Sequence, residues 1–200
     1  MNARNNSRSS TRHLNYSVKA AILGAIGYIL MFIEFPLPIF PGFLKLDFGE
    51  VTSIVAGFAL GPLYGVMAVL VKNLLHLLQT STAGSGELAN ICVGSAMVLT
   101  SSLIYHRTKT RKGALIGLVA GTVAMIIVGV IVNYLIVLPF YSTIMPMESI
   151  YNMASAINPR VNGMTTLLLY VFAPFNLIKG LLLSIIVFLI YKKISRLLHG

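Results

Sequence analysis

Charged residues are scarce in this 200-residue chain, and tryptophan is absent from it. Charged residues make up 10% of the sequence, whereas a soluble domain carries about 25%. Hydrophobic residues make up 56%, and the mean hydropathy is +0.85. This composition excludes an ordinary soluble domain and indicates an integral membrane protein. A chain of this length has room for about six membrane spans, but little for an extramembrane catalytic or nucleotide-hydrolysing domain.

Acidic residues and cysteine are rarer still. The chain has five Asp and Glu residues in all, and Asp47 is its single aspartate, which excludes a metal site built from several aspartates. Cys92 is its single cysteine, which excludes a disulfide framework and a thiolate metal cluster. The H-E-x-x-H, G-x-S-x-G and Walker A motifs are absent as well. The sequence therefore predicts no enzyme and no metal site, and active transport by this chain would need separate ATPase subunits.

Most of the basic residues fall in three clusters that flank apolar segments. The clusters are Arg4, Arg8, Arg12 and Lys19; Arg107, Lys109, Arg111 and Lys112; and Lys192, Lys193 and Arg196. No aromatic or glycine-rich interleaving accompanies them, which argues against nucleic-acid binding. The positive-inside rule places all three clusters on the cytoplasmic side of a membrane.

Six apolar segments are expected to cross or enter the membrane. They cover about residues 17–35, 48–61, 63–79, 87–106, 114–140 and 165–191, and the second is short for a full crossing. Six crossings place both termini and the 107–112 loop on the same side, in agreement with the basic clusters. We therefore predict an all-α integral membrane protein, a compact six-helix bundle that forms a single domain over residues 17–197. A polar, basic arm over residues 1–16 precedes it and is expected to be disordered or bound to a surface.

The loop between the first two spans, residues 36–47, is unusual. Its three prolines, Pro36, Pro38 and Pro41, forbid a continuing helix, yet most of its other residues are apolar. An apolar irregular loop is expected to be buried against the bundle or against a ligand. Of the other connections, residues 80–86 predict a flexible connector, and Glu148–Ile157 predicts a short interfacial helix that ends before Asn158-Pro159.

The most informative polar residue is Lys179, near the middle of the last apolar segment. A charged amine in a span costs about 2.5–3.5 kcal/mol on insertion scales, so it is expected to face a polar cavity or the bundle interior. Asn176 lies three residues earlier, on the same helix face. Pro174 either frees backbone carbonyls there or starts the inner helix afresh. The alternative is that Lys179 pairs with a buried carboxylate for structure alone.

Other polar residues inside the spans have two interpretations each. Asn133, deep in the fifth span, suits a heteroaromatic ring edge or an interhelical hydrogen bond. Glu87 and Asn90, at the outward start of the fourth span, suit ligand contact or, for Glu87, the helix dipole alone. Lys72, Asn73 and His76, close together in the third span, could line a cavity, or Lys72 could pair with Asp47 or Glu50. The structural interpretation is preferred.

Four segments together resemble a known family. The run FPLPIFPGFLKLDFGEV at residues 35–51 occurs with VKNLLHLL at 71–78, GELANICVG at 86–94 and APFNLIKG at 173–180. With these segments the chain resembles the riboflavin-binding S components of energy-coupling factor (ECF) vitamin transporters. The similarity covers nearly the whole chain outside the polar arm. Sister S components for thiamine, biotin or folate share the architecture, but are not expected to combine this loop with APFN-x-x-KG.

The resemblance implies a six-helix, non-enzymatic subunit of the bacterial cell membrane, with both termini cytoplasmic and an outward substrate site under the first loop. Riboflavin would be its cargo and not a cofactor. Its partners would be a transmembrane coupling protein and two cytoplasmic ATPases. The residues that the resemblance implies in riboflavin binding are Asn133, Asn176, Lys179, Phe43, Leu44, Lys45, Leu46, Asp47, Glu87 and Asn90. Phe40, with Phe43 and Leu44, is expected to cover the face of the flat, apolar ring. The small residues Ala21 and Ala25, four apart in the first span, would contact the coupling protein.

Three alternatives stay open at this point. An S component for another vitamin would share the fold and would not carry a flavin when purified. A membrane-bound lipid enzyme would turn over without an ATPase partner, and the scarcity of acidic residues argues against it. A structural or assembly subunit would tie Lys179 to a carboxylate with no cavity beside it.

Overall fold

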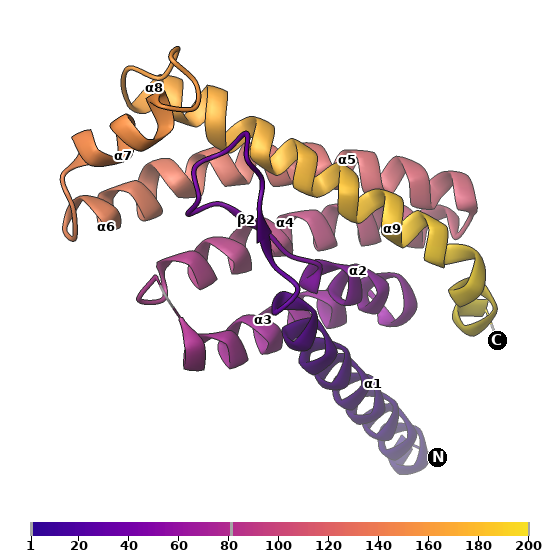
Figure 1. Ribbon diagram of the computed structural model, residues 1–200. Helices are drawn as coiled ribbons and strands as arrows, with labels where there is room; N and C mark the ends of the chain where they lie inside the picture. The colour runs from indigo at the N-terminus through magenta and orange to yellow at the C-terminus, as the bar shows by residue number, and fades with distance from the viewer. Residues whose placement is uncertain (1, 81, 200) are drawn as a thin grey trace.

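The computed structural model is almost entirely helical (Figure 1). It describes residues 2–80 and 82–199, and the side chains of residues 11–80 and 82–191. The elements in chain order are α1 (Asn2–Met31), β1 (Phe35–Pro36), β2 (Lys45–Leu46), α2 (Gly49–Leu60), α3 (Pro62–His76), the 3₁₀ helix η1 (Leu77–Gln79), α4 (Ser85–Thr108), α5 (Arg111–Val132), the π-helix η2 (Asn133–Val137), α6 (Leu138–Ser142), α7 (Met147–Ser155), α8 (Met164–Leu167), the π-helix η3 (Leu168–Phe172) and α9 (Ala173–His199).

Five helical stretches in the described part of the chain are long and apolar enough to cross a membrane. They are Thr11–Met31, Pro62–Gln79, Ser85–Thr108, Arg111–Ser142 and Met164–Tyr191. Helix α2 has 12 residues and rises roughly 18 Å, less than the ~30 Å of a bilayer core. An all-α fold of membrane type is therefore confirmed. The count of six crossings stays a prediction, because α2 is too short to cross by itself.

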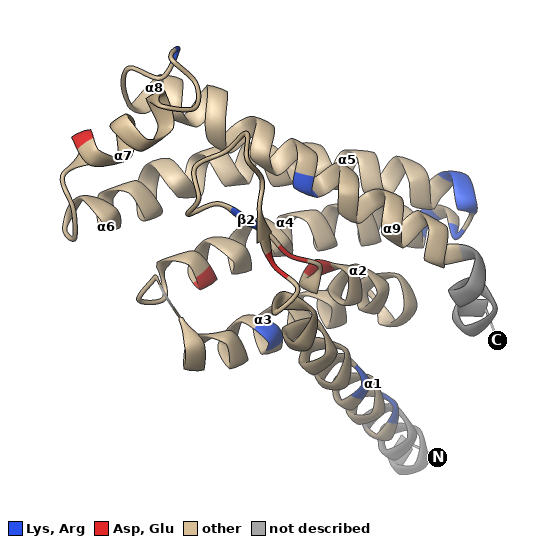
Figure 2. Ribbon diagram, viewed as in Figure 1, with Lys and Arg blue, Asp and Glu red and all other residues tan. Residues whose placement is uncertain are grey.

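The polar arm expected over residues 1–16 is continuous with the first helix. The backbone of α1 is helical from Asn2, and the described residues 11–15 are exposed. The side chains of residues 1–10 lie outside the described part, as do those of Lys192, Lys193 and Arg196. Six of the described basic residues lie on the N-terminal part of α1 or at the α4–α5 turn, on the side of the molecule where both termini lie (Figure 2). The others, Lys45, Lys72, Arg160 and Lys179, lie elsewhere in the fold.

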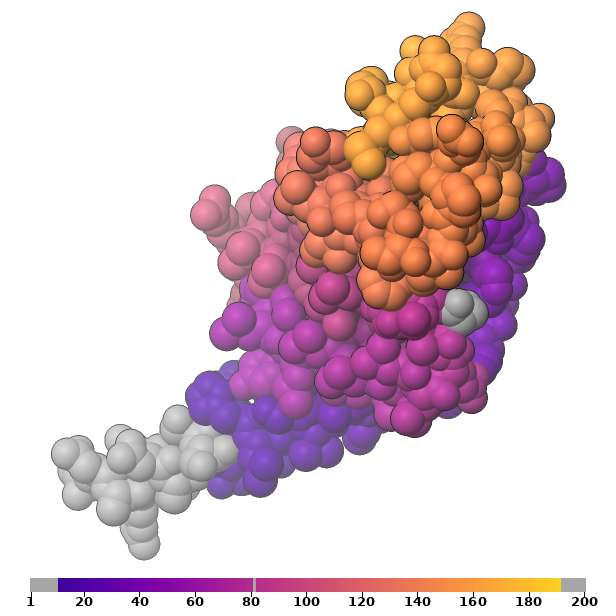
Figure 3. Space-filling view, turned by 90° about the vertical axis from the view of Figure 1, so that its left-hand side faces the viewer, coloured from indigo at the N-terminus to yellow at the C-terminus, as the bar shows by residue number. Residues whose placement is uncertain are grey.

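Two hydrophobic cores hold the bundle together. The larger core joins α2, α4, α5 and α9 through side chains such as Ile54, Met97, Leu118 and Leu183, all 0% exposed. The second core lies around the outer ends of the helices, where α6, α7 and α8 gather (Figures 1 and 3). The α1–α2 loop contributes Phe40 and Leu46 to this second core. The loop is thus anchored on the end of the bundle that carries the outer connections.

The α1–α2 loop is more ordered than its sequence predicts. Strands β1 and β2 pair antiparallel, with Phe35 opposite Leu46 and Pro36 opposite Lys45. The pair brings the two ends of the loop together, and the middle of the loop reaches across the bundle toward α9 (Figure 1). The expectation that an apolar loop would be buried is confirmed for Phe40, Pro41 and Leu46, whereas Ile39 is exposed.

Two prolines are accommodated inside continuous helices by π-helical turns. In the fifth span, Leu138 donates its N–H to the Asn133 carbonyl, five residues back, and Pro139 follows. In the last span, Ala173 donates to the Leu168 carbonyl, and Pro174 follows. Proline lacks an N–H and its ring crowds the preceding turn, so a widened turn lets the chain continue. The expectation that Pro174 restarts the helix is therefore wrong.

Glycine allows a close hairpin between α2 and α3. Gly61 separates the two helices with φ +120°, a value that side chains rarely tolerate. Farther along the hairpin, a Cβ on Gly65 would lie 2.7 Å from the Gly57 Cα. The backbones of the two helices are therefore in direct contact at this point.

We expect Gly65→Ala to lower the free energy of unfolding by about 1–3 kcal/mol, because the added methyl group meets backbone that cannot move aside cheaply. Thermal unfolding in detergent, followed by circular dichroism, measures the change. Gly163→Ala is the matched control, because a Cβ on Gly163 has no atom within 4 Å. Equal melting temperatures for the two variants would contradict this account of the hairpin.

Candidate functional site

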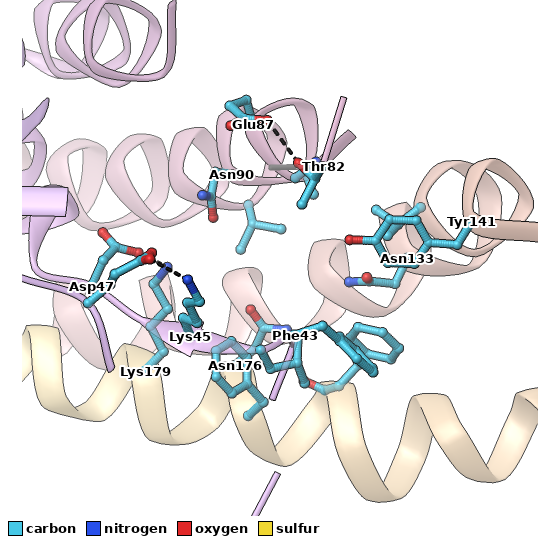
Figure 4. Close-up of a pocket in the computed structure, with 18 of the residues that line it drawn as sticks. Phe43, Lys45, Asp47, Thr82, Glu87, Asn90, Asn133, Tyr141, Asn176 and Lys179 are labelled. Carbon is cyan, nitrogen blue, oxygen red and sulfur yellow. Dashed lines mark hydrogen bonds and ion pairs between the residues drawn. The ribbon is translucent and has the colours of Figure 1, made fainter. Parts of the chain in front are cut away.

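A cavity of about 630 Å³ opens between the α1–α2 loop and the outer ends of the helices. Its walls come from that loop, the α3–α4 connection, α4, η2, the α6–α7 region and α9. In the close-up, polar side chains from these elements surround one central space (Figure 4). Apolar groups form most of the remaining wall, among them Val93, Met125, Phe172 and Phe175. Such a cavity suits a largely apolar guest that has a polar edge.

Nine of the eleven residues expected to bind substrate line this cavity. They are Phe43, Leu44, Lys45, Asp47, Glu87, Asn90, Asn133, Asn176 and Lys179. The other two, Phe40 and Leu46, are buried in the second core, and Phe40 packs edge-on against Phe175 at 5.4 Å. These two side chains support the loop from beneath instead of facing the cavity. The loop has no repeating pattern from which its inner and outer sides could be told apart.

The ammonium of Lys179 lies at the cavity wall, held by a carboxylate. Lys179 Nζ donates to Asp47 Oδ2 at 2.6 Å, and both side chains are buried. The other oxygen of the carboxylate, Asp47 Oδ1, accepts the Gly49 N–H at 2.9 Å. The pair ties the end of the α1–α2 loop to α9. The carboxylate partner of Lys179 is what a purely structural subunit was expected to show. The cavity beside the pair was not expected of such a subunit.

The surroundings of Asp47 keep its carboxyl group ionised. Burial alone would raise its pKa, but the charges of Lys179 and Lys72 and the hydrogen bonds from Lys179 and Gly49 outweigh that effect. The pKa of Asp47 is thereby lowered from 3.8 to about 2. The ion pair with Lys179 is therefore present throughout the neutral and mildly acidic range.

Asn133 and Asn176 present their amides to the cavity from two neighbouring helices. Each is buried and donates from Nδ2 to the carbonyl four residues earlier, Asn133 to Gly129 at 2.7 Å and Asn176 to Phe172 at 2.9 Å. Asn133 is the first residue of the π-helical turn η2, and the acceptor of Asn176, Phe172, is the last residue of η3. Gly129 also makes room for Asn176, since a Cβ there would lie 2.6 Å from Asn176 Nδ2. These contacts fix the orientation of both amides.

Glu87 holds the opposite rim of the cavity. Its Oε1 contacts His76 Nδ1 at 2.7 Å, and its Oε2 accepts from the hydroxyls of Thr80 and Thr82 at 2.9 and 3.1 Å. The Thr80 and Thr82 hydroxyls in turn accept backbone N–H groups of the same connector. The segment 80–86, which was expected to be a flexible connector, is therefore held at Thr80 and Thr82 by hydrogen bonds to the first turn of α4. Glu87 has a structural role here in addition to lining the cavity.

A second lysine–carboxylate pair lies in the cavity lining. Lys45 Nζ lies 2.5 Å from Glu34 Oε1 at the exposed mouth of the cavity. Together with Lys179–Asp47 and His76–Glu87, it gives each of these three basic side chains an acidic partner. The arrangement suits a guest without net charge, recognised by hydrogen bonds.

Comparison with known proteins identifies the family. The family of ECF transporter substrate-specific components matches residues 15–191. The chain belongs to this family. Its proteins are membrane transporter components and not enzymes, so this S component works as one part of a larger transporter.

Two curated relatives and one solved structure resemble this S component over most of its length. The riboflavin transporter RibU of Staphylococcus aureus (strain TCH60) is 35% identical over 90% of each chain. The riboflavin transporter FmnP of Bacillus subtilis (strain 168) is 32% identical over 89% of this chain and 90% of its own. The solved structure of the S component of a bacterial ECF transporter is 33% identical, with a TM-score of 0.73, over 94% of this chain and 99% of its own.

Several residues that line the cavity of this S component were not predicted as site residues. Glu34, Thr82 and Tyr141 come from connecting segments or helix ends, and Phe172 and Phe175 come from the last span. The aromatic residues have no sequence feature that separates them from core residues. Glu34 could have been predicted from the sequence, because it is one of the chain's few acidic residues and lies next to the proline-rich loop.

The small residues of α1 in this S component lie on different faces of the helix. Gly24 and Gly27 face the bundle, where a Cβ would lie 2.8 Å from Val71 Cβ and 2.9 Å from the Gly49 carbonyl, respectively. Ala21 and Ala25 are only partly buried. The two glycines therefore explain the packing of α1 inside the protein. The two alanines are available to a partner, as their predicted role requires.

We expect acid to weaken this S component through Asp47. The pKa of Asp47 is lowered from 3.8 to about 2, so its ionised form stabilises the folded state by about 2–3 kcal/mol. This contribution is complete above pH ~4 and is lost as the pH falls through ~2. Asp47→Asn should be less stable at neutral pH and should lack this loss on acidification. Thermal unfolding of both proteins across this pH range measures the difference, with the exposed Glu148→Gln as control. An identical acid response in Asp47→Asn would contradict the assignment.

Proposed function

We propose that this S component captures riboflavin on the outer face of the bacterial cell membrane. The observation that carries the proposal is the convergence of Lys179, Asn133 and Asn176 on one cavity beneath the α1–α2 loop. The riboflavin transporters RibU and FmnP, which share about a third of their residues with this chain, support the choice of vitamin.

The cavity matches the chemistry of an isoalloxazine, which is flat and apolar with a polar rim. Phe43, Phe172 and Leu44 offer apolar surface to its faces. Lys179 can donate to a ring carbonyl, and the amides of Asn133 and Asn176 can both accept and donate at the ring edge or the ribityl hydroxyls. Bound riboflavin would carry no charge into this largely apolar space, so the two lysine–carboxylate pairs of the lining, Lys45–Glu34 and Lys179–Asp47, need not be broken.

The site would face outward, with both termini in the cytoplasm. Six described basic residues support this orientation, because Arg12, Lys19, Arg107, Lys109, Arg111 and Lys112 lie at the end of the bundle away from the outer loops, whereas Arg160 lies among those loops (Figure 2). Helix α2 would complete the sixth crossing as a short helix that does not span the bilayer by itself. The α1–α2 loop would act as a lid that opens to admit the vitamin.

The partners would be a transmembrane coupling protein and two cytoplasmic ATPases. ATP-driven movement of these subunits would release riboflavin inward, with the S component tilting as a body. Ala21 and Ala25, small and partly buried on α1, would let a helix of the coupling protein approach closely.

We expect Lys179→Ala and Asn133→Ala each to raise the riboflavin dissociation constant by more than about tenfold. Lys179→Ala removes hydrogen bonds from a charged group, which are worth about 1.5–3 kcal/mol. Asn133→Ala removes the hydrogen bonds of an amide, each of which is worth somewhat less. Isothermal titration of the purified protein in detergent measures the affinity. Asn152→Ala, exposed on α7, is the control.

Unchanged affinity in both cavity variants would defeat the site assignment. The visible absorption spectrum of the protein, purified from riboflavin-fed cells, tests the vitamin itself. A flavin spectrum supports the proposal, and capture of another vitamin in its place would overturn it.

We expect the double variant Ala21→Phe/Ala25→Phe to lose co-purification with the coupling protein and ATPases while still binding riboflavin, since the bulky rings prevent close helix approach. Ile26→Phe is the matched control, because Ile26 is 43% exposed on the same helix and lies off the row formed by Ala21 and Ala25. Intact complexes containing the double variant would rule out this contact surface.

A further inference from the structure

A second ion pair is buried behind the cavity. Lys72 Nζ of α3 lies 2.7 Å from Glu50 Oε1 of α2, and the two side chains are 0% and 2% exposed. Neither residue is among the described residues that line the cavity. Burying two ions costs several kcal/mol each before their attraction is counted, so such a pair is weak evidence of a purely stabilising role. Its position suggests another role.

The pair is linked to the substrate site through Asp47. Glu50 follows Asp47 by three residues, and the Gly49 N–H between them donates to Asp47 Oδ1 at 2.9 Å. Asp47 is also stabilised in its charged form by Lys72, in addition to its contact with Lys179. One carboxylate at the cavity therefore lies in the field of two lysines, one from α3 and one from α9.

The pair is also enclosed by helices α1 and α4. The Lys72 stem passes Gly27, whose added Cβ would lie 3.4 Å from Lys72 Cδ, and Lys72 Nζ lies 3.9 Å from the sulfur of Met31, a cavity residue. On the other side, a Cβ on Gly94 would overlap the Glu50 carboxylate. Gly94 is one turn from Asn90, which lines the cavity. The pair thus joins four helices at the base of the substrate loop.

We propose that Lys72 and Glu50 are positioning residues of the substrate site, which fix the start of α2 and the charge of Asp47 so that Lys179 can donate to the ligand. Lys72 is one of two lysines whose charge stabilises the Asp47 carboxylate, and its own ion-pair partner is Glu50. Without Lys72, the Asp47 carboxylate would keep only Lys179 and the Gly49 N–H as partners. The inference rests on the proposed capture of riboflavin and extends its site by two residues that do not touch the vitamin.

The double variant Glu50→Gln/Lys72→Met tests the proposal, because it removes both charges, keeps similar side-chain volumes and leaves no unpaired ion in the core. The riboflavin dissociation constant should rise at least about tenfold, the equivalent of ~1.4 kcal/mol. Its ratio to that of the unmodified protein should also grow as the pH falls toward ~4, because Asp47 then takes up a proton more readily.

Tyr105→Phe is the control, since it removes a buried hydroxyl contact to Tyr191 at the other end of α4. Gly94→Ala is a second test that keeps both charges and displaces Glu50, and it should weaken riboflavin binding in the same direction. Affinity within about twofold of the unmodified protein in both the double variant and Gly94→Ala, with an unchanged pH dependence, would overturn the proposal.

Failure of the inference can be told apart from failure of the proposed function. If the unmodified protein binds no riboflavin, the proposed function fails, and hydrogen exchange of residues 42–50 in the ligand-free protein still tests the positioning role. Faster exchange in the double variant than in Tyr105→Phe supports that role, because the start of α2 has lost its anchor. Equal exchange in the two variants would overturn it.

Discussion

The contact between Lys179 and Asp47 is the interaction on which the rest of the site depends. A lysine inside a hydrocarbon-length segment is costly unless it meets a partner or water, and here it meets both a carboxylate and a cavity. Because Asp47 stands where the α1–α2 loop enters α2, satisfying one charge also fixes the loop against α9. The loop in turn forms a wall of the cavity. Charge compensation, loop position and ligand space are therefore consequences of the same contact.

The two π-helical turns give the site a second constraint. Each widens a span just before a proline and places an asparagine beside the cavity, Asn133 at the start of one turn and Asn176 just after the other. The extra residue in η3 rotates the residues that follow it, so a regular helix would direct Asn176 differently. The prolines therefore contribute to recognition through backbone geometry, although neither lies in the cavity lining among the described residues.

Much of the fold could be predicted from the sequence, because long apolar runs and the flanking basic clusters report directly on a membrane environment. The expected segments at 48–61, 63–79, 87–106 and 114–140 agree with the helices to within a few residues. The pairing of Lys72 with Glu50 was among the expected possibilities, since so few acids exist. The contact of Lys179 with Asp47 across 132 residues was weighed only as an alternative to a cavity. The π-helical turns and the inward side of the α1–α2 loop had no local signal, because proline is compatible with several backbone paths and the loop has no period.

The lysine pairs in and behind the cavity have a consequence for energetics in the bilayer. Glu34–Lys45, Asp47–Lys179 and Glu50–Lys72 place three negative and three positive charges together, so their sum is zero. Each uncompensated elementary charge carried through a membrane is worth about 2.3 kcal/mol per 100 mV. A subunit that turns in the bilayer with these pairs intact, carrying an uncharged vitamin, does no net electrical work in this region. For these three pairs, movement through the bilayer would therefore not depend on the voltage of the cell.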